Sequence, residues 1–187
     1  MRITGGRWRS RALEAPRGIA TRPTSDRVRE ALFSMLVSDG LIGDDDGPRV
    51  LDLYAGTGAL AFEALSRGAS QAVLVEHGRD AVTTIRKNAR ALGAEDLLLL
   101  FDTKVERALP KIEGPFGVVF LDPPYADVLT PAFTGILARA AALLAPGGAL
   151  LLEHASCDAP PEISGLELDR SRRYGDTSLT IYRAPQP

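Results

Sequence analysis

Apolar and polar residues alternate regularly between Arg49 and His154, and this alternation predicts a series of strands and helices. Short continuous apolar runs are typical of strands buried on both faces, whereas apolar residues at every third or fourth position are typical of amphipathic helices. The predicted strands lie in "RVLDLY", "AVLVE", "LLLLF", "GVVFLD" and "ALLLEH", and the predicted helices in "ALAFEALSRGA", "DAVTTIRKNARALG", "KVERAL" and "PAFTGILARAAALLAPGG". This order predicts βαβ units, and therefore an α/β, doubly wound fold with helices on both faces of a parallel sheet.

The C-terminal segment departs from this alternation. In "LELDRSRRYGDTSLTIYR" polar residues alternate with apolar ones on both sides of Gly175 and Asp176, which predicts two strands joined by a tight turn. A terminal hairpin on a doubly wound sheet is a particular variant of the architecture. His154, after the fifth predicted strand, is interpreted as a surface or edge residue.

The N-terminal part also differs from the rest. Residues 1–23 show little helical periodicity and are predicted to be extended or looped, whereas Asp26 to about Val37 have helical spacing after an N-cap at Thr24 or Ser25. The exposed face of that helix is expected to carry Arg27, Arg29 and Glu30. We therefore divide the chain into a basic arm and helix (1–37), a Gly/Asp-rich linker (38–48) and a main domain (49–187).

Arginines are concentrated at the start of the chain. Residues 1–29 hold eight arginines against Glu14 and Asp26, a charge of 8 − 2 = +6, so the remainder carries −2 − 6 = −8. The arginines are Arg2, Arg7, Arg9, Arg11, Arg17, Arg22, Arg27 and Arg29. A basic segment on an acidic body indicates an anionic partner, usually nucleic acid. A solvated segment without a partner has the same charge, so charge alone leaves both interpretations open.

The composition excludes several classes of protein. The chain of 187 residues is 45% hydrophobic, which suits one globular domain, and it has no apolar run long enough to span a membrane. Its first residues lack the apolar region of a secretory signal. The single cysteine, Cys157, excludes an internal disulfide and a multi-cysteine zinc site. We expect a cytoplasmic protein with no structural metal.

A glycine-rich loop follows the first predicted strand of the main domain. In "DLYAGTGALA" the residues Gly56, Gly58 and Ala61 fit the G-x-G-x-x-G/A pattern, in which glycines allow a tight turn close to a nucleotide. Glu76 ends the next strand, where an acidic side chain can accept hydrogen bonds from ribose hydroxyls. The pattern fits a dinucleotide site, an S-adenosylmethionine site or a turn without a ligand. Asp52 favours the methyl donor, because its carboxylate can reach the donor's cationic amino-acid end.

The sequence "DPPY", Asp122 to Tyr125, follows the fourth predicted strand and opens onto the same edge of the sheet. An exocyclic amino nitrogen is a poor nucleophile until two acceptors hold its N–H bonds and direct its lone pair at a methyl group. Asp122 supplies one acceptor and the carbonyl of Pro123 the other. Pro124 stiffens the backbone, and Tyr125 offers a face on which a base can stack. The alternative, a proline-rich turn with Asp122 as a cap, is the weaker interpretation once the glycine loop is considered.

With these motifs, the chain resembles Rossmann-like S-adenosylmethionine-dependent methyltransferases that modify amino groups, which have a seven-stranded sheet whose last strand is antiparallel. Within this class it is similar to the bacterial small-subunit (16S) ribosomal RNA guanine-N2 methyltransferases. The similarity runs through "MRITGGRWRSRAL", "TRPTSDRVREALFSML", "VLDLYAGTGALAFEALSRGA", "FLDPPY" and "RRYGDTSLTIY". The second stretch is the most distinctive, because generic methyltransferases lack it.

The resemblance implies a role for three sets of residues. The donor site comprises Asp52, Tyr54, Ala55, Gly56, Thr57, Gly58 and Glu76. The target guanine is held by Asp122, Pro123, Pro124 and Tyr125. Contacts to rRNA come from Arg2, Arg7, Trp8, Arg9, Arg11, Arg22, Arg27 and Arg29. Whether Asp102 or Lys104 faces the adenine of the donor stays open.

The resemblance also implies partners. S-Adenosylmethionine is the expected methyl donor, with S-adenosylhomocysteine as product, and the expected substrate is rRNA within a small ribosomal subunit or an assembly intermediate. We expect a monomer that binds no membrane. The alternatives are a DNA or RNA amino methyltransferase acting on adenine N6 or cytosine N4, a nicotinamide-dependent oxidoreductase, and an RNA-binding scaffold without activity.

Overall fold

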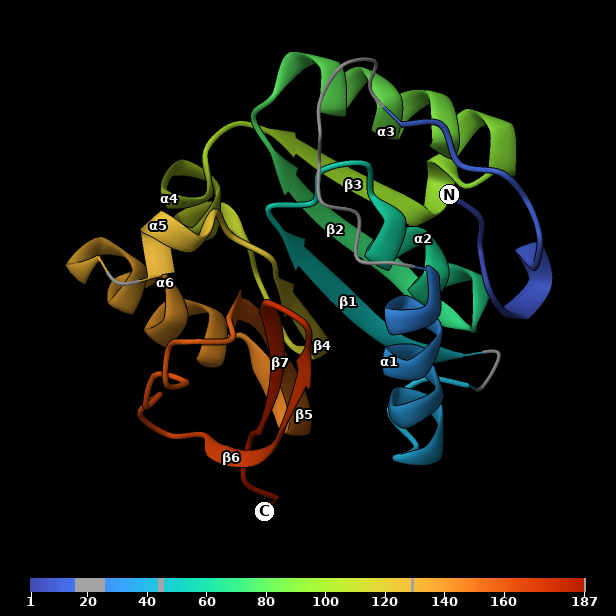
Figure 1. The fold of residues 1–187 in the computed structure, drawn as a ribbon. Coiled ribbons are helices and arrows are strands. Elements are labelled where there is room, and N and C mark those ends of the chain that lie inside the picture. Colours follow the sequence, from blue (N-terminus) through green and yellow to red (C-terminus); the bar gives the residue numbers. More distant parts are fainter. Residues whose placement is uncertain (16–25, 44–45, 129, 187) are drawn as a thin grey trace.

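A computed structural model describes residues 1–15, 26–43, 46–128 and 130–186. A single sheet of seven strands, ordered β3-β2-β1-β4-β5-β7-β6, runs through the molecule (Figure 1). The strands are β1 (Gly47–Leu53), β2 (Ala69–Glu76), β3 (Leu98–Asp102), β4 (Phe116–Leu121), β5 (Leu144–Ala155), β6 (Glu167–Tyr174) and β7 (Thr177–Arg183). The pairs from β3 to β5 are parallel, and β7 is antiparallel to β5 and β6. The predicted seven-stranded, doubly wound sheet with an antiparallel last strand is confirmed.

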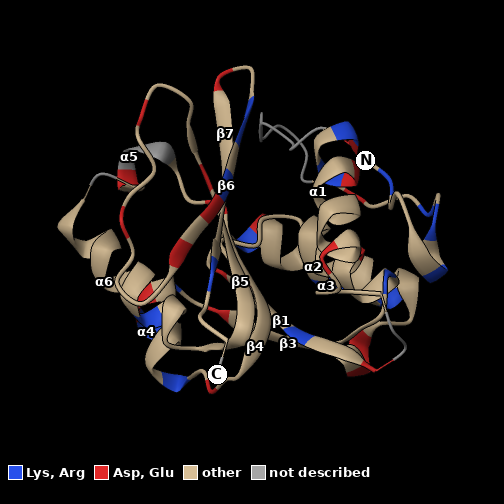
Figure 2. Cartoon of the chain, turned by 90° about the horizontal axis from the view of Figure 1, so that it is seen from below, with Lys and Arg blue, Asp and Glu red and all other residues tan. Residues whose placement is uncertain are grey.

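Helices cover both faces of the sheet. They are α1 (Asp26–Ser38), α2 (Ala59–Ser66), α3 (Arg79–Leu92), α4 (Val105–Ala108), α5 (Tyr125–Val128) and α6 (Pro131–Ala141), with single 3-10 turns η1 (Gly6–Trp8), η2 (Glu95–Leu97) and η3 (Leu109–Lys111). In Figure 2 the helices α1, α2 and α3 lie on one side of the sheet, and α4, α5 and α6 on the other. Each side buries its own apolar core against alternate residues of the strands. None of the described helices is long and apolar enough to cross a membrane.

The strand order reverses next to β1. From β1 the chain builds outward through β2 to β3, and then returns to place β4 on the other side of β1. In folds of this type, ligands bind outside the carboxyl ends of the strands at the point of reversal. Asp52 pairs in register with Phe120 of β4, two residues before Asp122. We call this side, where β1, β2 and β4 end, the carboxyl edge, and the opposite side the amino edge.

The largest difference from the predicted elements lies before the fifth strand. The predicted helix extended through "ALLAPGG", but α6 ends at Ala141 and β5 begins at Leu144. Leu144 pairs with Phe116, and the register shifts before Ala149 pairs with Val118. Gly147, at φ 72°, adopts the left-handed conformation that this irregular segment needs. The predicted caps Thr24 and Ser25 lie outside the described residues.

The N-terminal arm is folded back on itself and packed against α2. Residues 1–13 form a short hairpin in which Arg2 and Ala12 form an antiparallel β-bridge and η1 lies in the turn. Ile3 and Leu13 are buried in the same core as α1, α2 and α3. The arm is therefore part of the apolar core and shares its stability.

Candidate active site

Backbone conformation shapes the glycine loop between β1 and α2. Tyr54, Gly56 and Gly58 have φ values of 67°, 55° and 76°. A side chain on Gly58 would approach the Phe62 ring to 2.7 Å, so the loop needs glycine there. A side chain on Gly56 would meet nothing within 4 Å. Gly56 therefore faces open space, as a residue lining a ligand cradle does, and the left-handed Tyr54 is backbone strain of the kind found at functional sites.

Glu76 holds the glycine loop against the end of β2. One of its carboxylate oxygens accepts a hydrogen bond from the Gly56 amide at 2.8 Å, and the other accepts from the amides of His77 and Gly78, each at 2.7 Å. A carboxylate has about four acceptor positions, so at least one lone pair stays available. The arrangement fixes the loop and leaves an acceptor for a ligand hydroxyl.

Asp52 is a buried carboxylate near the end of β1. It is 1% exposed, and neither of its oxygens has a hydrogen-bond partner among the described residues. Burial, followed by repulsion from Asp122 and Glu76, raises the pKa of Asp52 to about 8, although the nearby Ala61 amide opposes the shift. Leaving such a group unpaired is costly. Its chemistry suits a cationic or N–H donor supplied by a ligand.

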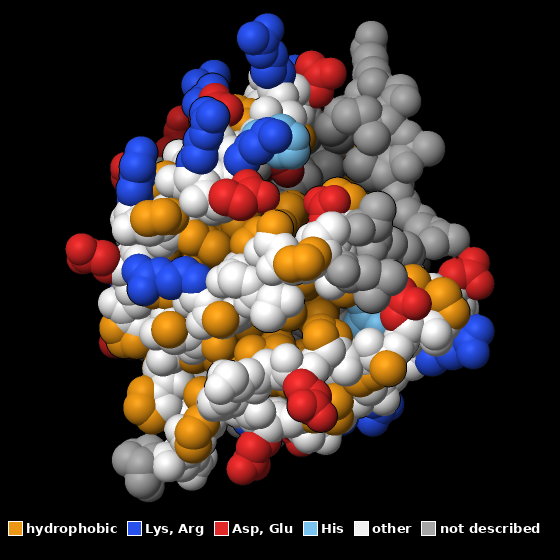
Figure 3. Space-filling model, turned by 90° about the vertical axis from the view of Figure 1, so that its left-hand side faces the viewer, with side chains coloured by type: hydrophobic (Ala, Val, Ile, Leu, Met, Phe, Trp, Pro, Cys, Tyr) orange, Lys and Arg blue, Asp and Glu red, His pale blue; other side chains and the backbone are white. Residues whose placement is uncertain are grey.

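Asp122 lies directly after β4, next to this carboxylate. Burial, followed by repulsion from Glu153, raises the pKa of Asp122 to about 7. Pro123 is buried, Pro124 is exposed, and Tyr125 begins α5. Figure 3 faces the side toward which the arrows of β1 and β2 point in Figure 1, and hydrophobic side chains gather in its middle with acidic side chains around them. Asp52, Glu76 and Asp122 make the carboxyl edge acidic.

The other residues predicted to bind the methyl donor, Tyr54, Ala55 and Thr57, differ in their burial and contacts. Ala55 is buried, and its amide donates to the Val75 carbonyl at 3.0 Å. Tyr54 is half-buried; burial, followed by repulsion from Glu106 and Asp127, raises the pKa of its phenol to about 12. The Thr57 hydroxyl is directed toward the sulfur of Met1, 4.0 Å away. The structure thus turns the Thr57 side chain to the arm.

The predicted role of Arg29 is wrong. Its side chain is 1% exposed and forms ion pairs with Asp26 at 3.0 Å and with buried Glu63 at 3.4 Å, and it donates to the Arg2 carbonyl. Arg29 precedes Leu32, Phe33 and Leu36 by three, four and seven positions, so helical spacing places all four on one face. That face is buried, and Arg29 cannot contact RNA from it.

The other predicted RNA contacts are mostly exposed. Arg2, Arg7, Arg9, Arg11 and Arg27 are on the surface, and Arg22 lies outside the described residues. Trp8 is half-buried against the core, with the Arg7 guanidinium 4.2 Å from the centre of its ring. Trp8 therefore anchors the arm on the core of the domain. Its amide donates to Ser66 Oγ, which places the arm's tip at the end of α2, on the amino edge.

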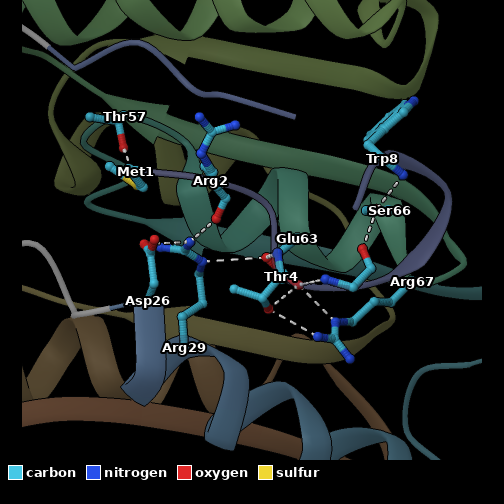
Figure 4. Close-up of polar contacts among 11 residues, drawn as sticks. Met1, Arg2, Thr4, Trp8, Asp26, Arg29, Thr57, Glu63, Ser66 and Arg67 are labelled. Carbon is cyan, nitrogen blue, oxygen red and sulfur yellow. Dashed lines mark hydrogen bonds and ion pairs between the residues drawn. The ribbon is translucent and has the colours of Figure 1, made fainter. Parts of the chain in front are cut away.

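Sequence reasoning missed the group of residues that docks the arm. Glu63, on α2, is fully buried and accepts hydrogen bonds from the Thr4 amide and hydroxyl, the Gly5 amide and the side chains of Arg29 and Arg67 (Figure 4). Asn88, on α3, accepts from the Glu14 amide and donates to the carbonyls of Glu14 and Thr57. A glutamate inside an otherwise apolar helix was the available signal for the first of these residues.

His154 also differs from its prediction. It is 1% exposed, and its Nε2 lies 2.9 Å from the hydroxyl of Thr180 on β7. That hydroxyl lies 2.8 Å from Ser171 on β6. The histidine therefore belongs to a buried polar chain across three strands, away from the surface.

Known proteins resemble this chain over much of its length. A family model described as "Conserved hypothetical protein 95" matches residues 1–183. "Putative rRNA methyltransferase YlbH" of Bacillus subtilis (strain 168) is 35% identical over 188 residues, 98% of each chain. "Ribosomal RNA small subunit methyltransferase D" of Escherichia coli (strain K12) is 40% identical over 125 residues, 67% of this chain and 60% of that protein. The solved structure titled "Putative methyltransferase yhhF from Escherichia coli" has a TM-score of 0.85 and 31% identity, covering 100% of this chain and 99% of that one. The similarity includes the N-terminal arm.

Proposed function

Because this chain belongs to the family described as Conserved hypothetical protein 95, we infer that it is an rRNA methyltransferase. Its donor is S-adenosylmethionine, and its target is the exocyclic N2 amino group of a guanine in small-subunit rRNA. The observation that carries this conclusion is the pair of carboxyl groups with raised pKa values, buried Asp52 and partly buried Asp122, at the point where the strand order reverses.

The residues present fit the donor. S-Adenosylmethionine supplies a methyl group bound to a positively charged sulfur, and it carries an ammonium group, two ribose hydroxyls and a base. Asp52 has two oxygens that accept no hydrogen bond from the described part of the chain and suit the ammonium. Gly56 faces open space, and Glu76 keeps an acceptor for the ribose. The Asp52 carboxylate, the open space and the spare acceptor thus each correspond to a group of the donor that could occupy them.

Asp122 and Pro123 act on the amino group that receives the methyl. When the Asp122 carboxylate and the Pro123 carbonyl each accept one N–H, the nitrogen lone pair points out of the base plane toward the donor. Once it has accepted the methyl group, that nitrogen would carry a positive charge. Asp122 stabilises that charge and, with its pKa raised to about 7, can accept the surplus proton.

A second candidate is amino methylation of adenine N6 or cytosine N4, because those groups have the same two N–H bonds. The relatives' names favour small-subunit rRNA, and the exposed arginines of the arm suit an RNA backbone. The substrate within the cell is then rRNA in a small subunit or an assembly intermediate.

Methyl-labelled donor tests this function. The protein is incubated in parallel with small subunits from cells lacking the matching enzyme, with naked rRNA and with duplex DNA, and the labelled nucleoside is identified. Label in N2-methylguanosine from the subunit is expected. Label in N6-methyladenine or N4-methylcytosine would overturn the target, and no label in any arm despite tight binding of S-adenosylhomocysteine would overturn the reaction.

Asp122→Asn tests the role of the carboxylate. Turnover is expected to fall about 100- to 1,000-fold, because the acceptor loses its charge, while the Kd of S-adenosylhomocysteine changes less than about threefold. Asp46→Asn, at an exposed position before β1, is the matched control and keeps full turnover. An equal loss of donor binding in Asp122→Asn would show that Asp122 supports the donor site rather than the amino group.

A further inference from the structure

One face of α3 carries a row of exposed cations that the donor and target sites do not use. Val82, Ile85, Ala89 and Leu92 are buried against the sheet. Arg79, Arg86, Lys87 and Arg90 are exposed on the opposite face. In Figure 3, Lys and Arg side chains gather along the upper border of the view, where Figure 1 places α3.

The position of α3 connects the two edges of the sheet. The helix begins at Arg79, three residues after Glu76 at the carboxyl edge, and runs back to Gly93 at the amino edge. With 14 residues it is about 21 Å long. Its last turn meets the arm, since Arg11 donates to the Ala91 carbonyl at 2.7 Å. The cations of α3 therefore continue into the exposed arginines of the arm.

The charges of this surface have the opposite sign to the rest of the chain. We call it the α3–arm surface; its cations are Arg2, Arg7, Arg9, Arg11, Arg79, Arg86, Lys87 and Arg90. The neighbouring acids are Glu14, Asp80, Glu95, Asp96 and Asp102, which gives 8 − 5 = +3 against −2 − 3 = −5 for the remainder. The positive patch thus stands out from an otherwise acidic protein.

The ion pairs within this surface are weak. Arg86–Asp102, Lys87–Glu14 and Arg90–Glu95 have separations of 3.4, 3.7 and 3.5 Å, and all six side chains are about half or more exposed. Exposed pairs of this kind contribute about 0–1 kcal/mol. Each cation can therefore exchange its carboxylate for a phosphate at little cost, and the carboxylates return to water.

We propose that the α3–arm surface holds the RNA backbone on the path from the target base at the carboxyl edge to the tip of the arm at the amino edge. The proposal rests on the proposed function, which supplies the RNA and places the reacting base. A track of about 20 Å accommodates several consecutive phosphates. It also explains how a short arm whose tip lies far from Asp122 serves the same substrate.

The test is the salt dependence of RNA binding. The variant R86Q/K87Q/R90Q and the wild type are titrated with small subunits and with naked rRNA across a range of salt concentrations. Each lost phosphate contact reduces the slope of log K against log salt by about 0.7–0.9, so the slope is expected to fall by about 2 in the triple variant. The variant R139Q/R172Q/R173Q removes three exposed cations from α6 and β6 and is the matched control, with an unchanged slope.

Each outcome separates the surface from the function. Binding of S-adenosylhomocysteine and the melting temperature, measured for both variants, show whether a change lies in RNA binding alone. If the wild type methylates RNA but the α3 variant keeps the wild-type slope, the proposed RNA-binding role of the α3–arm surface is overturned and the proposed function is retained. The surface is likewise overturned if the slope of the control variant falls as much. If the wild type neither binds nor methylates RNA, both proposals are overturned together.

Discussion

Glu63 on α2 and Asp52 on β1 are both buried carboxylates, and their surroundings are opposite. Glu63 accepts hydrogen bonds from Thr4 and Gly5 and is paired with two arginines. Asp52 has neither a hydrogen-bond donor nor an ion-pair partner among the described residues. Burial raises the pKa of Asp52 to about 8, so the carboxyl group of the ligand-free protein keeps its proton at neutral pH.

The difference separates a carboxylate that maintains the fold from one that is kept for a ligand. A buried charge with a full set of donors can be retained at little net cost, whereas one without donors lowers the stability of the folded state. A protein keeps the second kind where binding or chemistry uses it. The two residues belong to one strand–loop–helix segment, Asp52 near the end of β1 and Glu63 within α2. Each change below acts on one of them and spares the other.

Replacing Glu63 is expected to have the largest effect. Glu63→Ala leaves buried Arg29 with the half-exposed Asp26 as its ion-pair partner and removes the buried acceptor for the arm, so the free energy of unfolding should fall by about 3–5 kcal/mol. Urea titration measures the loss. Trp8 is the single tryptophan of the chain and lies in the arm, so its fluorescence reports whether the arm undocks.

Glu167→Ala, at an exposed position on β6, is the control for Glu63→Ala and should change stability by less than about 0.5 kcal/mol. If Glu63→Ala costs as little, or if Trp8 fluorescence is unchanged, Glu63 does not hold the arm.

Asp52→Asn should change donor binding and stability in opposite directions. The affinity for S-adenosylhomocysteine is expected to fall about 10- to 100-fold, because the amide gives the ammonium no opposite charge. At pH 8 the ligand-free variant should melt at a higher temperature than the wild type, since a buried charge is removed. Calorimetric titration and thermal unfolding measure the two. A variant that loses both affinity and stability would place Asp52 with Glu63 as a structural carboxylate.

The pH dependence follows from the raised pKa of Asp52. The folded, ligand-free protein holds this proton up to about pH 8, while the unfolded chain releases it near 3.8. Stability therefore falls as pH rises through that window. A bound ammonium favours the ionised form, so affinity for S-adenosylhomocysteine should rise by up to about tenfold per pH unit between pH 6 and 7.5. An equal slope in Asp52→Asn would assign the proton to another group, such as Asp122.

Thr4→Val should have the smallest effect. It removes the hydroxyl that donates to Glu63 at 2.7 Å and accepts from Arg67 at 3.0 Å, and it leaves the Thr4 amide bond to Glu63 in place. Two hydrogen bonds are lost, and each contributes about 1 kcal/mol, so the free energy of unfolding should drop by about 2 kcal/mol. A loss as large as that of Glu63→Ala would mean that Thr4, and not the carboxylate, is the centre of the cluster.

Local patterns predicted the fold and the core of the candidate site. The alternation of strands and helices predicted the sheet, and Asp52, Gly58 and Asp122 were identifiable because each stands at the end of a strand or in a turn of defined spacing. In a parallel sheet the residues that follow successive strands come together at the carboxyl edge, so their proximity can be predicted without knowing any contact between distant residues.

The residues that escaped prediction depend on contacts between distant positions. Glu63 meets Thr4 across 59 residues, and Asn88 meets Glu14 across 74. Contacts between such distant residues produce no periodic pattern in the sequence from which they could be predicted. Arg29 is different, because its helical spacing from Leu32 and Phe33 indicates a buried position. It was predicted to be exposed because it is charged. A charged residue on an apolar stripe indicates a buried partner elsewhere in the chain.

The docking of the arm on Glu63 also sets an order in time. Thr4 and Gly5 are made before their acceptor, Glu63, which follows 58 or 59 residues later. At about 5–20 residues per second, these residues wait about 3–12 s for α2. Until then Ile3 and Leu13 have no core to enter. The arm is therefore made before α2 but can dock only after it, and a docked arm indicates that the helical layer beneath it has already formed.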